Sequence, residues 1–271
     1  MTAEAPPFET APSAGLARLA GSTLFVKLAA GAALLLVWEL GVRAWAPAYV
    51  ARPSGVLAVL PSVIASGAFL SAAAATLGSV LEGLAIALVL GIAVGVAMGR
   101  SFVVDRLIRY YVFGLFAMPM VAILPLITLW FGYTDAARLA TTVFAAFFSI
   151  VLNAADGARA VPLEYLEVGR SFRAPRLREL AEIVLPASMP YLLAGIRLAA
   201  ARALIGAVVA EFFISVNGLG FFILFNSRSF RHNQAMVAVM VLAACGVGFE
   251  ALVNWVTRRY FPWYRRDEKP R

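Results

Sequence analysis

Residues 77–99, LGSVLEGLAIALVLGIAVGVAMG, are apolar along almost their whole length, and Glu82 is their only charged residue. Because about 20 helical residues cross the roughly 30 Å hydrocarbon core of a bilayer, this stretch is long enough to span a membrane. The whole chain agrees: 62% of its 271 residues are hydrophobic, against about 45–50% in soluble domains, and its mean hydropathy is +0.85. The sequence therefore predicts an all-α, polytopic membrane protein.

Six segments qualify as membrane spans, and the stretch that holds residues 110–133 is the clearest because it carries no charge. An even number of spans places both termini on one side, and most Lys and Arg residues then lie in segments that the positive-inside rule assigns to the cytoplasm. We expect an N-in, C-in arrangement in which Arg138, Arg228 and Arg231 lie outside. The expected spans are residues 24–46, 76–99, 110–133, 137–154, 188–213 and 235–257.

The ends of the chain differ from this apolar region. We expect residues 1–23 to form a disordered cytoplasmic tail, since Glu4 and Glu9 stand where a secretory signal would have basic residues. We expect residues 258–271 to form a basic cytoplasmic tail. The membrane domain is then residues 24–257.

Small side chains recur at every fourth position along the second expected span. Such a stripe lets another helix approach closely, so it predicts a helix-packing surface rather than a route for a solute. The stripe consists of Gly83, Ala87, Gly91, Gly95 and Gly99.

Three residues are candidates for a pathway through the membrane. Pro119 and Pro125 each remove a helical hydrogen bond, so the third span should be kinked or partly unwound. Irregular backbone at that depth either is buried by protein or lines a wet cavity. Glu211, near the end of the fifth span, either snorkels to the interface or pairs with a group from another helix or subunit.

Several classes of protein are excluded or disfavoured by missing motifs. The chain has no G-x-x-x-x-G-K-[ST] loop, and neither Lys27 nor Lys269 follows a glycine, so it carries no phosphate-binding loop of its own. Cys245 and His232 are the only residues of their types, which predicts no metal site and no intrachain disulfide. Basic residues lie between apolar segments, which argues against nucleic-acid binding.

A charged stretch interrupts the apolar chain at residues 167–190, EVGRSFRAPRLRELAEIVLPASMP. It resembles the cytoplasmic loop of binding-protein-dependent ABC importer permeases, whose pattern is E-A-A, three residues, G, nine residues, I, one residue, L-P. Glu167 begins the pattern here, and Ile183, Leu185 and Pro186 stand at the expected spacings. Val168 and Gly169 replace the two alanines, and Arg173 replaces the glycine.

The resemblance extends from about Pro53 to Trp263, and residues 77–99, 118–132 and 208–223 look like segments of the subgroup that imports sulfonates, taurine, nitrate or pyrimidine precursors. It implies a bacterial inner-membrane subunit, a second permease subunit, which we expect to be a second copy, two cytoplasmic ATPase subunits and an external solute-binding protein. It also implies that this chain binds no cofactor, since ATP and Mg²⁺ belong to the ATPase.

The resemblance makes residues 155–187 the coupling loop, and the residue pattern agrees. Residues 164–172 can form a short amphipathic helix, with Tyr165, Leu166, Val168 and Phe172 as apolar anchors that can enter a groove in a soluble partner. The predicted ATPase-coupling residues are Glu164, Glu167, Gly169, Arg170, Arg173, Ile183, Leu185 and Pro186. In place of glycine, Arg173 implies either a turn of another shape or an acidic contact on the partner.

Two external segments are candidates for docking the solute-binding protein. Residues 53–67 are expected to include a short surface helix, and residues 215–234 begin with turn chemistry at Asn217-Gly218 before an apolar run that can dip into the bilayer.

Other functional classes remain open from sequence alone. One is a self-contained channel or ion-coupled carrier, although no clear inverted repeat is visible. A second is an intramembrane enzyme. A third interpretation leaves the charged loop as an amphipathic helix resting on anionic lipid.

Overall fold

The computed structural model describes residues 23–47, 49–214 and 216–260. The expected N-terminal tail, apart from Thr23, lies outside these residues, as does the C-terminal tail from residue 261. Every element within the described ranges is helical, and five helices are long and apolar enough to cross a membrane, or six spans if one bent pair is counted as a span.

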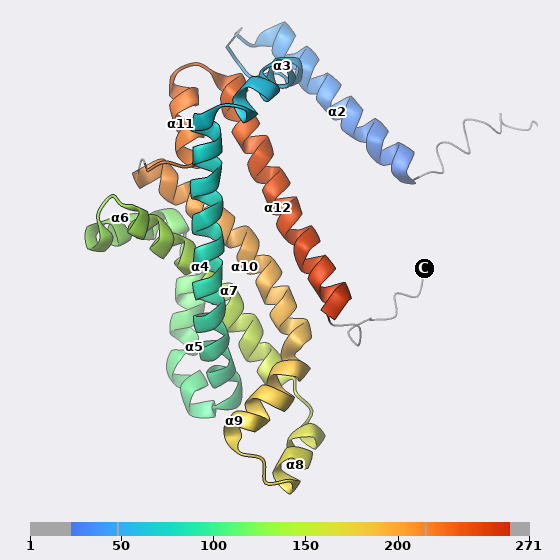
Figure 1. Cartoon of the computed structure of the whole chain (residues 1–271), viewed down its shortest axis with the longest axis vertical. Coiled ribbons are helices and arrows are strands. Elements are labelled where there is room, and N and C mark those ends of the chain that lie inside the picture. Colours follow the sequence, from blue (N-terminus) through green and yellow to red (C-terminus); the bar gives the residue numbers. More distant parts are fainter. Residues whose placement is uncertain (1–22, 48, 215, 261–271) are drawn as a thin grey trace, which may run out of the picture.

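The elements follow one another with short connections, and Figure 1 shows the longer helices running along the long axis of the molecule. Their bounds are α2 Thr23–Trp45, α3 Pro53–Ile64, α4 Gly67–Arg100, α5 Phe102–Ala117, α6 Met120–Phe131, α7 Asp135–Arg159, α8 Leu163–Ser171, α9 Arg176–Glu179, the π-helical turn η1 Leu180–Val184, α10 Leu185–Ile214, α11 Leu219–Arg228 and α12 His232–Tyr260.

The core consists of α7 packed between α4 and α10. Small residues permit this packing on the α4 side. A Cβ added at Gly91 would lie 2.9 Å from the Ile150 side chain, and one at Gly95 would lie 2.5 Å from the Val151 carbonyl oxygen. Both partners belong to α7, so the small-residue stripe of α4 lies against α7 at van der Waals distance.

Smaller apolar clusters close the two ends of this core. At one end, α3, α11 and α12 surround the start of α4, where Phe69 stacks edge-on against Phe222 at 5.5 Å between ring centroids. At the other end, Val96 and Ala158 pack against the loop between α7 and α10. The external segments predicted near residues 53–67 and 215–234 contain the short helices α3 and α11 at the first of these ends.

The expected third span differs most from the prediction. Where a kinked or partly unwound span over residues 110–133 was expected, the chain forms two helices, α5 and α6, which are bent by 104° relative to each other. The break falls at Met118 and Pro119, and Pro119 is the N-cap of α6. Pro125 lies inside α6 and causes no break. The chain before Pro119 already turns at Met118, which is extended, as the residue before a proline usually is.

The bounds of other spans also differ from those expected. α4 begins at Gly67, nine residues before the expected start, because the Ser66 hydroxyl caps the helix by accepting the Phe69 N–H. α2 is exposed along most of its length and is linked to α3 by Glu39, which accepts hydrogen bonds from the backbone N–H and hydroxyl of Ser54.

Candidate functional site

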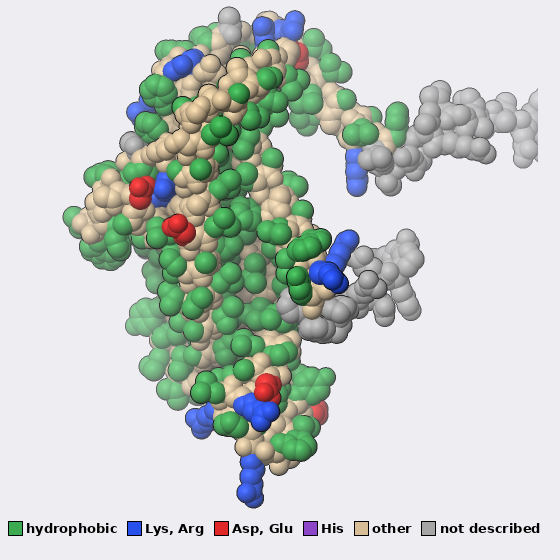
Figure 2. Space-filling model, viewed as in Figure 1, with side chains coloured by type: hydrophobic (Ala, Val, Ile, Leu, Met, Phe, Trp, Pro, Cys, Tyr) green, Lys and Arg blue, Asp and Glu red, His purple; other side chains and the backbone are tan. Residues whose placement is uncertain are grey.

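The loop predicted to contact a partner lies at one tip of the molecule. α8 and α9 lie beyond the ends of α4, α7 and α10, at the opposite end from α3 and α11 (Figure 1). Basic side chains gather at this tip (Figure 2). The exposed arginines of α8, of α9 and of the turn between them are Arg170, Arg173, Arg176 and Arg178.

Two close contacts fix α8 to the core. Leu166 is only 1% exposed and packs in a cluster with Ala158, Val161 and Val184, which belong to the end of α7, the following loop and η1. Gly169 faces the start of the next membrane helix, because a Cβ there would lie 2.7 Å from Ile183 Cδ1. The predicted residues Gly169 and Ile183 are therefore neighbours, and α8 is held between α7 and the helical segment that leads into α10.

The outer side of α8 is apolar and unburied. The side chains of Leu163, Tyr165, Val168 and Phe172 are between 56% and 82% exposed. Large patches of exposed apolar side chains often mark interaction surfaces, and α8 lies at the tip of the molecule, beyond the ends of α4, α7 and α10 (Figure 1). Leu166 was predicted as an anchor for a partner, but its burial makes it an anchor to the protein's own core.

The turn after α8 has the geometry that a glycine would favour. The N–H of Arg173 donates to the Arg170 carbonyl at 2.8 Å, and the N–H of Ala174 donates to the Gly169 carbonyl at 3.0 Å. This pair of bonds is a Schellman motif, and Arg173 occupies its left-handed position with φ of 51°. The alternative that this turn differs in shape from one with glycine at position 173 is therefore wrong. The Arg173 side chain is exposed.

The charged residues of the loop fall into two groups. Glu179 pairs with Arg100 at 3.4 Å, and Glu182 pairs with Arg178 at 2.9 Å. In contrast, four of the predicted coupling residues are exposed and have no ion pair within the described chain. These are Glu164, Glu167, Arg170 and Arg173.

A groove runs beside α8. It has a volume of about 540 Å³ and is lined by Tyr165, Val168, Ile183, Pro186 and Pro190, together with Glu182 and Ala187. Ile183, which lines the groove, belongs to the π-helical turn Leu180–Val184, and the half-buried Leu185 follows this turn at the start of α10. Such turns often occur at functional sites. The groove and the apolar face of α8 form one continuous surface that suits an inserted partner segment.

The pathway candidates Pro119, Pro125 and Glu211 do not form one cluster. Glu211 is fully buried, which makes snorkelling to the interface wrong, and its partners come from three other elements. It accepts hydrogen bonds from Thr76 on α4 at 2.8 Å and from the Gly220 N–H on α11 at 2.7 Å, and its carboxylate lies 3.5 Å from Arg138 on α7. The network joins helices at the end opposite α8.

Arg138 is a functional candidate that the sequence did not single out. It was expected only as one of the arginines on the external side of the membrane. It is 7% exposed, and it donates to the Asn217 carbonyl at 2.5 Å and pairs with Asp135 at 2.8 Å. Its position one turn into an apolar helix was the available signal, since a charge there needs a partner.

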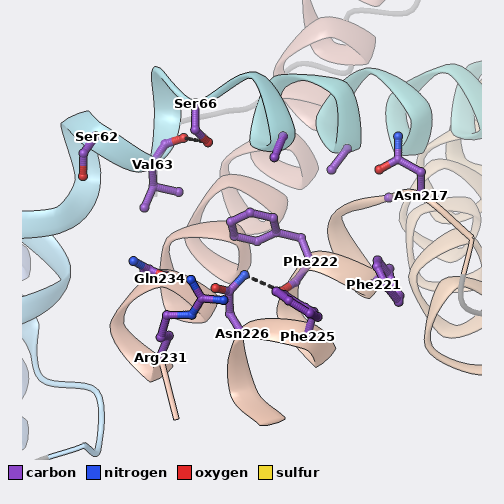
Figure 3. A pocket seen from close by; sticks show the side chains of 13 residues that line it. Ser62, Val63, Ser66, Asn217, Phe221, Phe222, Phe225, Asn226, Arg231 and Gln234 are labelled. Carbon is purple, nitrogen blue, oxygen red and sulfur yellow. Dashed lines mark hydrogen bonds between the residues drawn. The ribbon is translucent and has the colours of Figure 1, made fainter. Parts of the chain in front are cut away.

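A second cavity lies at the α3 and α11 end, and Figure 3 shows its lining. It has a volume of about 540 Å³ between the start of α4 and α11. Phe222 and Phe225 supply an apolar wall, while Asn226 and Arg231 add polar groups; the Asn226 amide donates to the Phe222 carbonyl at 2.8 Å. Arg228 is exposed but is not part of this lining.

Comparison with known proteins identifies a family. The family described as "Binding-protein-dependent transport system inner membrane component" matches residues 87–266, which include the whole loop and α10.

Curated relatives are similar over most of their length. The formylaminopyrimidine transport permease protein ThiX of Halalkalibacterium halodurans is 27% identical over 86% of this chain and 94% of its own. The taurine transport system permease protein TauC of Escherichia coli is 27% identical over 86% of this chain and 87% of its own. The nitrate import permease protein NrtB of Leptolyngbya laminosa is 28% identical over 93% of this chain and 94% of its own.

Two solved structures share the fold. An amino acid ABC transporter chain covers 74% of this chain and 97% of its own with a TM-score of 0.58 and 17% identity. A chain of the MetNI methionine ABC transporter, in an inward-facing form, matches over 75% of this chain and 95% of its own, with a TM-score of 0.52 and 16% identity.

Proposed function

Because this chain belongs to the family of binding-protein-dependent transport system inner membrane components, we propose that α8 is the contact through which a cytoplasmic ATPase drives it. The chain is a multi-pass membrane protein and a permease subunit of an ABC importer, as are its relatives. The proposal adds the residues that couple it to its partner and the class of solute that it moves.

The observation that carries the proposal is the two-sided nature of α8. One side is fixed by Leu166 and by Gly169 against Ile183, while the other side exposes Tyr165, Val168 and further apolar side chains. A helix with an apolar face can bind in a hydrophobic groove of a soluble partner. The unpaired Glu167 and Arg170 can add charged contacts at the rim of that surface.

The same geometry supports a mechanical role. Leu166 packs against Val184 and Ala158, so a displacement of α8 pushes on the end of the π-helical turn, where α10 begins, and on the end of α7. Because α7 packs along both α4 and α10 through close contacts, these helices should move together as one body. Closure of two ATPase subunits on ATP would then reorient the pathway between the two sides of the membrane.

The solute class is proposed from the relatives. Their names specify aliphatic sulfonates, taurine, nitrate, bicarbonate and formylaminopyrimidine. We propose a small anionic or polar solute, delivered by an external binding protein that docks at the α3 and α11 end. The assembly would contain two copies of this chain in a bacterial inner membrane, N-in and C-in, with ATP and Mg²⁺ on the ATPase.

The test is copurification of the chain with a co-expressed ABC ATPase from the same organism, followed by ATP hydrolysis in proteoliposomes. Tyr165→Ala and the double variant Glu167→Ala/Arg170→Ala should retain the folded membrane domain but lose most of the bound ATPase and of the stimulated hydrolysis. Tyr133→Ala is the matched control, because Tyr133 is 71% exposed and lies just after α6, away from α8. It should bind the ATPase like the unmodified chain.

Two results would overturn the proposal. Normal ATPase binding by both α8 variants would remove α8 as the contact. Solute uptake by the chain alone, without any ATPase, would favour the self-contained carrier instead.

A further inference from the structure

Arg202 is a charged residue near the middle of the membrane helix α10 that the coupling scheme does not use. It is half-buried, and its guanidinium carbon lies 4.2 Å from the centroid of the Phe116 ring on α5. One turn further along α10, a Cβ at Gly206 would touch Ala145 of α7 and Met120 of α6. Arg202 therefore lies at the level of the 104° bend between α5 and α6.

Within the described residues no acidic side chain pairs with Arg202. This separates it from Arg138, which is paired with both Asp135 and Glu211. A central arginine costs about 2.5–3.5 kcal/mol on membrane-insertion scales. Stacking on an aromatic ring returns only about 0.5–2 kcal/mol, so the arrangement leaves part of the charge uncompensated.

Arg202 lines a cavity of about 340 Å³. The walls are otherwise apolar and come from four helices and the break between two of them: Phe116 of α5, Met118 at the break, Met120 of α6, Phe144 and Phe148 of α7, and Leu198 and Ile205 of α10. Cavities of roughly 300–1,000 Å³ with apolar walls and a few placed polar groups are typical of small-molecule sites. The broken helix supplies the irregular backbone that membrane proteins tolerate where a cavity is lined.

We propose that Arg202 is the anion-binding subsite of the solute pathway, which rests on the proposed permease function. A guanidinium presents planar donors that can bind two oxygens of a sulfonate, nitrate or carboxylate at once. The apolar walls hold the remainder of the solute and exclude water, which strengthens the charge interaction. Lipid phosphates are an unsuitable source of the anion, because Arg202 lies well inside α10 (Leu185–Ile214) rather than at one of its ends.

The test measures equilibrium binding of ethanesulfonate and of nitrate to the purified permease–ATPase complex by calorimetry, without the external binding protein. Ethanesulfonamide, which is neutral, serves as the chemical control. Arg202→Gln should weaken anion binding at least tenfold, and Arg202→Lys, which keeps the charge without the planar fork, should weaken it less. Arg197→Gln is the matched control on the same helix, since Arg197 is exposed and does not line the cavity.

Each outcome decides the proposal. Unchanged binding in Arg202→Gln, equal binding of the sulfonamide, or no anion binding by the unmodified complex would overturn the subsite while leaving ATPase coupling intact. A second pattern would also overturn the subsite. If Arg202→Gln prevented assembly of the complex while Arg202→Lys bound the anion with the affinity of the unmodified complex, Arg202 would instead form a salt bridge to the second subunit. Failure to recruit an ATPase would instead count against the proposed function, and anion binding to the chain alone would still test Arg202.

Discussion

The Glu211 carboxylate of α10 accepts a 2.7 Å hydrogen bond from the backbone N–H of Gly220 near the start of α11. The same carboxylate accepts a hydrogen bond from the Thr76 hydroxyl. The hydroxyl oxygen of Thr76 in turn accepts a hydrogen bond of 2.8 Å from the Leu219 N–H. Two backbone donors at the beginning of α11 are therefore satisfied by side chains of α4 and α10. This network fixes the short helix α11 to the long helices at the end of the molecule opposite α8.

Removing the Glu211 carboxylate should destabilise the chain strongly. Glu211→Ala leaves the Gly220 N–H and the Arg138 guanidinium buried without that partner, and breaking a buried pair typically costs about 3–5 kcal/mol. We expect a correspondingly lower free energy of unfolding in an SDS titration of the purified chain. Glu250→Ala is the control, because Glu250 is exposed on α12. Similar effects of the two substitutions would show that the network contributes no special stability.

Two glycines of α4 should respond to alanine with opposite signs. A Cβ at Gly95 meets the Val151 carbonyl and Ala154, so Gly95→Ala should separate α4 from α7 at a cost of about 1–3 kcal/mol. Nothing lies within 4 Å of a Cβ at Gly78, so Gly78→Ala should stabilise the same helix by about 0.5–1 kcal/mol. The melting temperature of each variant, measured in the same detergent, checks both signs. A higher melting temperature for Gly95→Ala would refute the close packing of α4 on α7.

The sequence predicted the helical class and the short helix at residues 164–172, and its six spans agree with the described residues if the bent α5–α6 pair is counted as one span. Apolar length and periodicity carry these features, because a bilayer admits few spanning structures. Pro119 indicated an irregular third span. The angle of the α5–α6 bend could not be predicted, because it depends on what α6 packs against after the break, which includes Leu124 and Ile127 against Ala210.

Contacts between distant residues were the other part that sequence could not provide. Glu211 was recognisable as a charge needing a partner, but Thr76 lies 135 residues earlier and Arg138 lies 73 residues earlier. Arg202 gave the same signal, yet only the fold places Phe116 and the cavity around it. In the coupling loop, spacing identified Gly169 and Ile183 separately, and the structure gives their contact.

Replacing Arg173 by glycine should stabilise the turn after α8. A left-handed conformation costs a non-glycine residue about 1–2 kcal/mol, so Arg173→Gly should slow amide hydrogen exchange at Ala174 by roughly tenfold. Arg176→Gly is the opposite case, because Arg176 begins α9 with helical geometry and glycine there should speed local exchange. Faster exchange at Ala174 in Arg173→Gly would contradict the Schellman assignment.

The proposed orientation predicts different labelling at the two ends of the molecule. In a Cys245→Ser background, Arg173→Cys should react with a membrane-impermeant maleimide only after inverted vesicles expose the cytoplasmic face. Phe230 is 67% exposed at the other end of the molecule, so Phe230→Cys should react in intact spheroplasts. The reverse pattern would invert the assignment and place α8 outside.

The most direct test of the central claim is site-specific crosslinking of α8 to the ATPase. In the Cys245→Ser background, Val168→Cys puts a thiol on the exposed side of α8, and Phe230→Cys puts one at the opposite end. With a short bifunctional crosslinker, Val168→Cys should form a covalent adduct with the ATPase whose yield changes when ATP binds, and Phe230→Cys should form none. An absent adduct at Val168, in complexes that still copurify with the ATPase, would contradict the account.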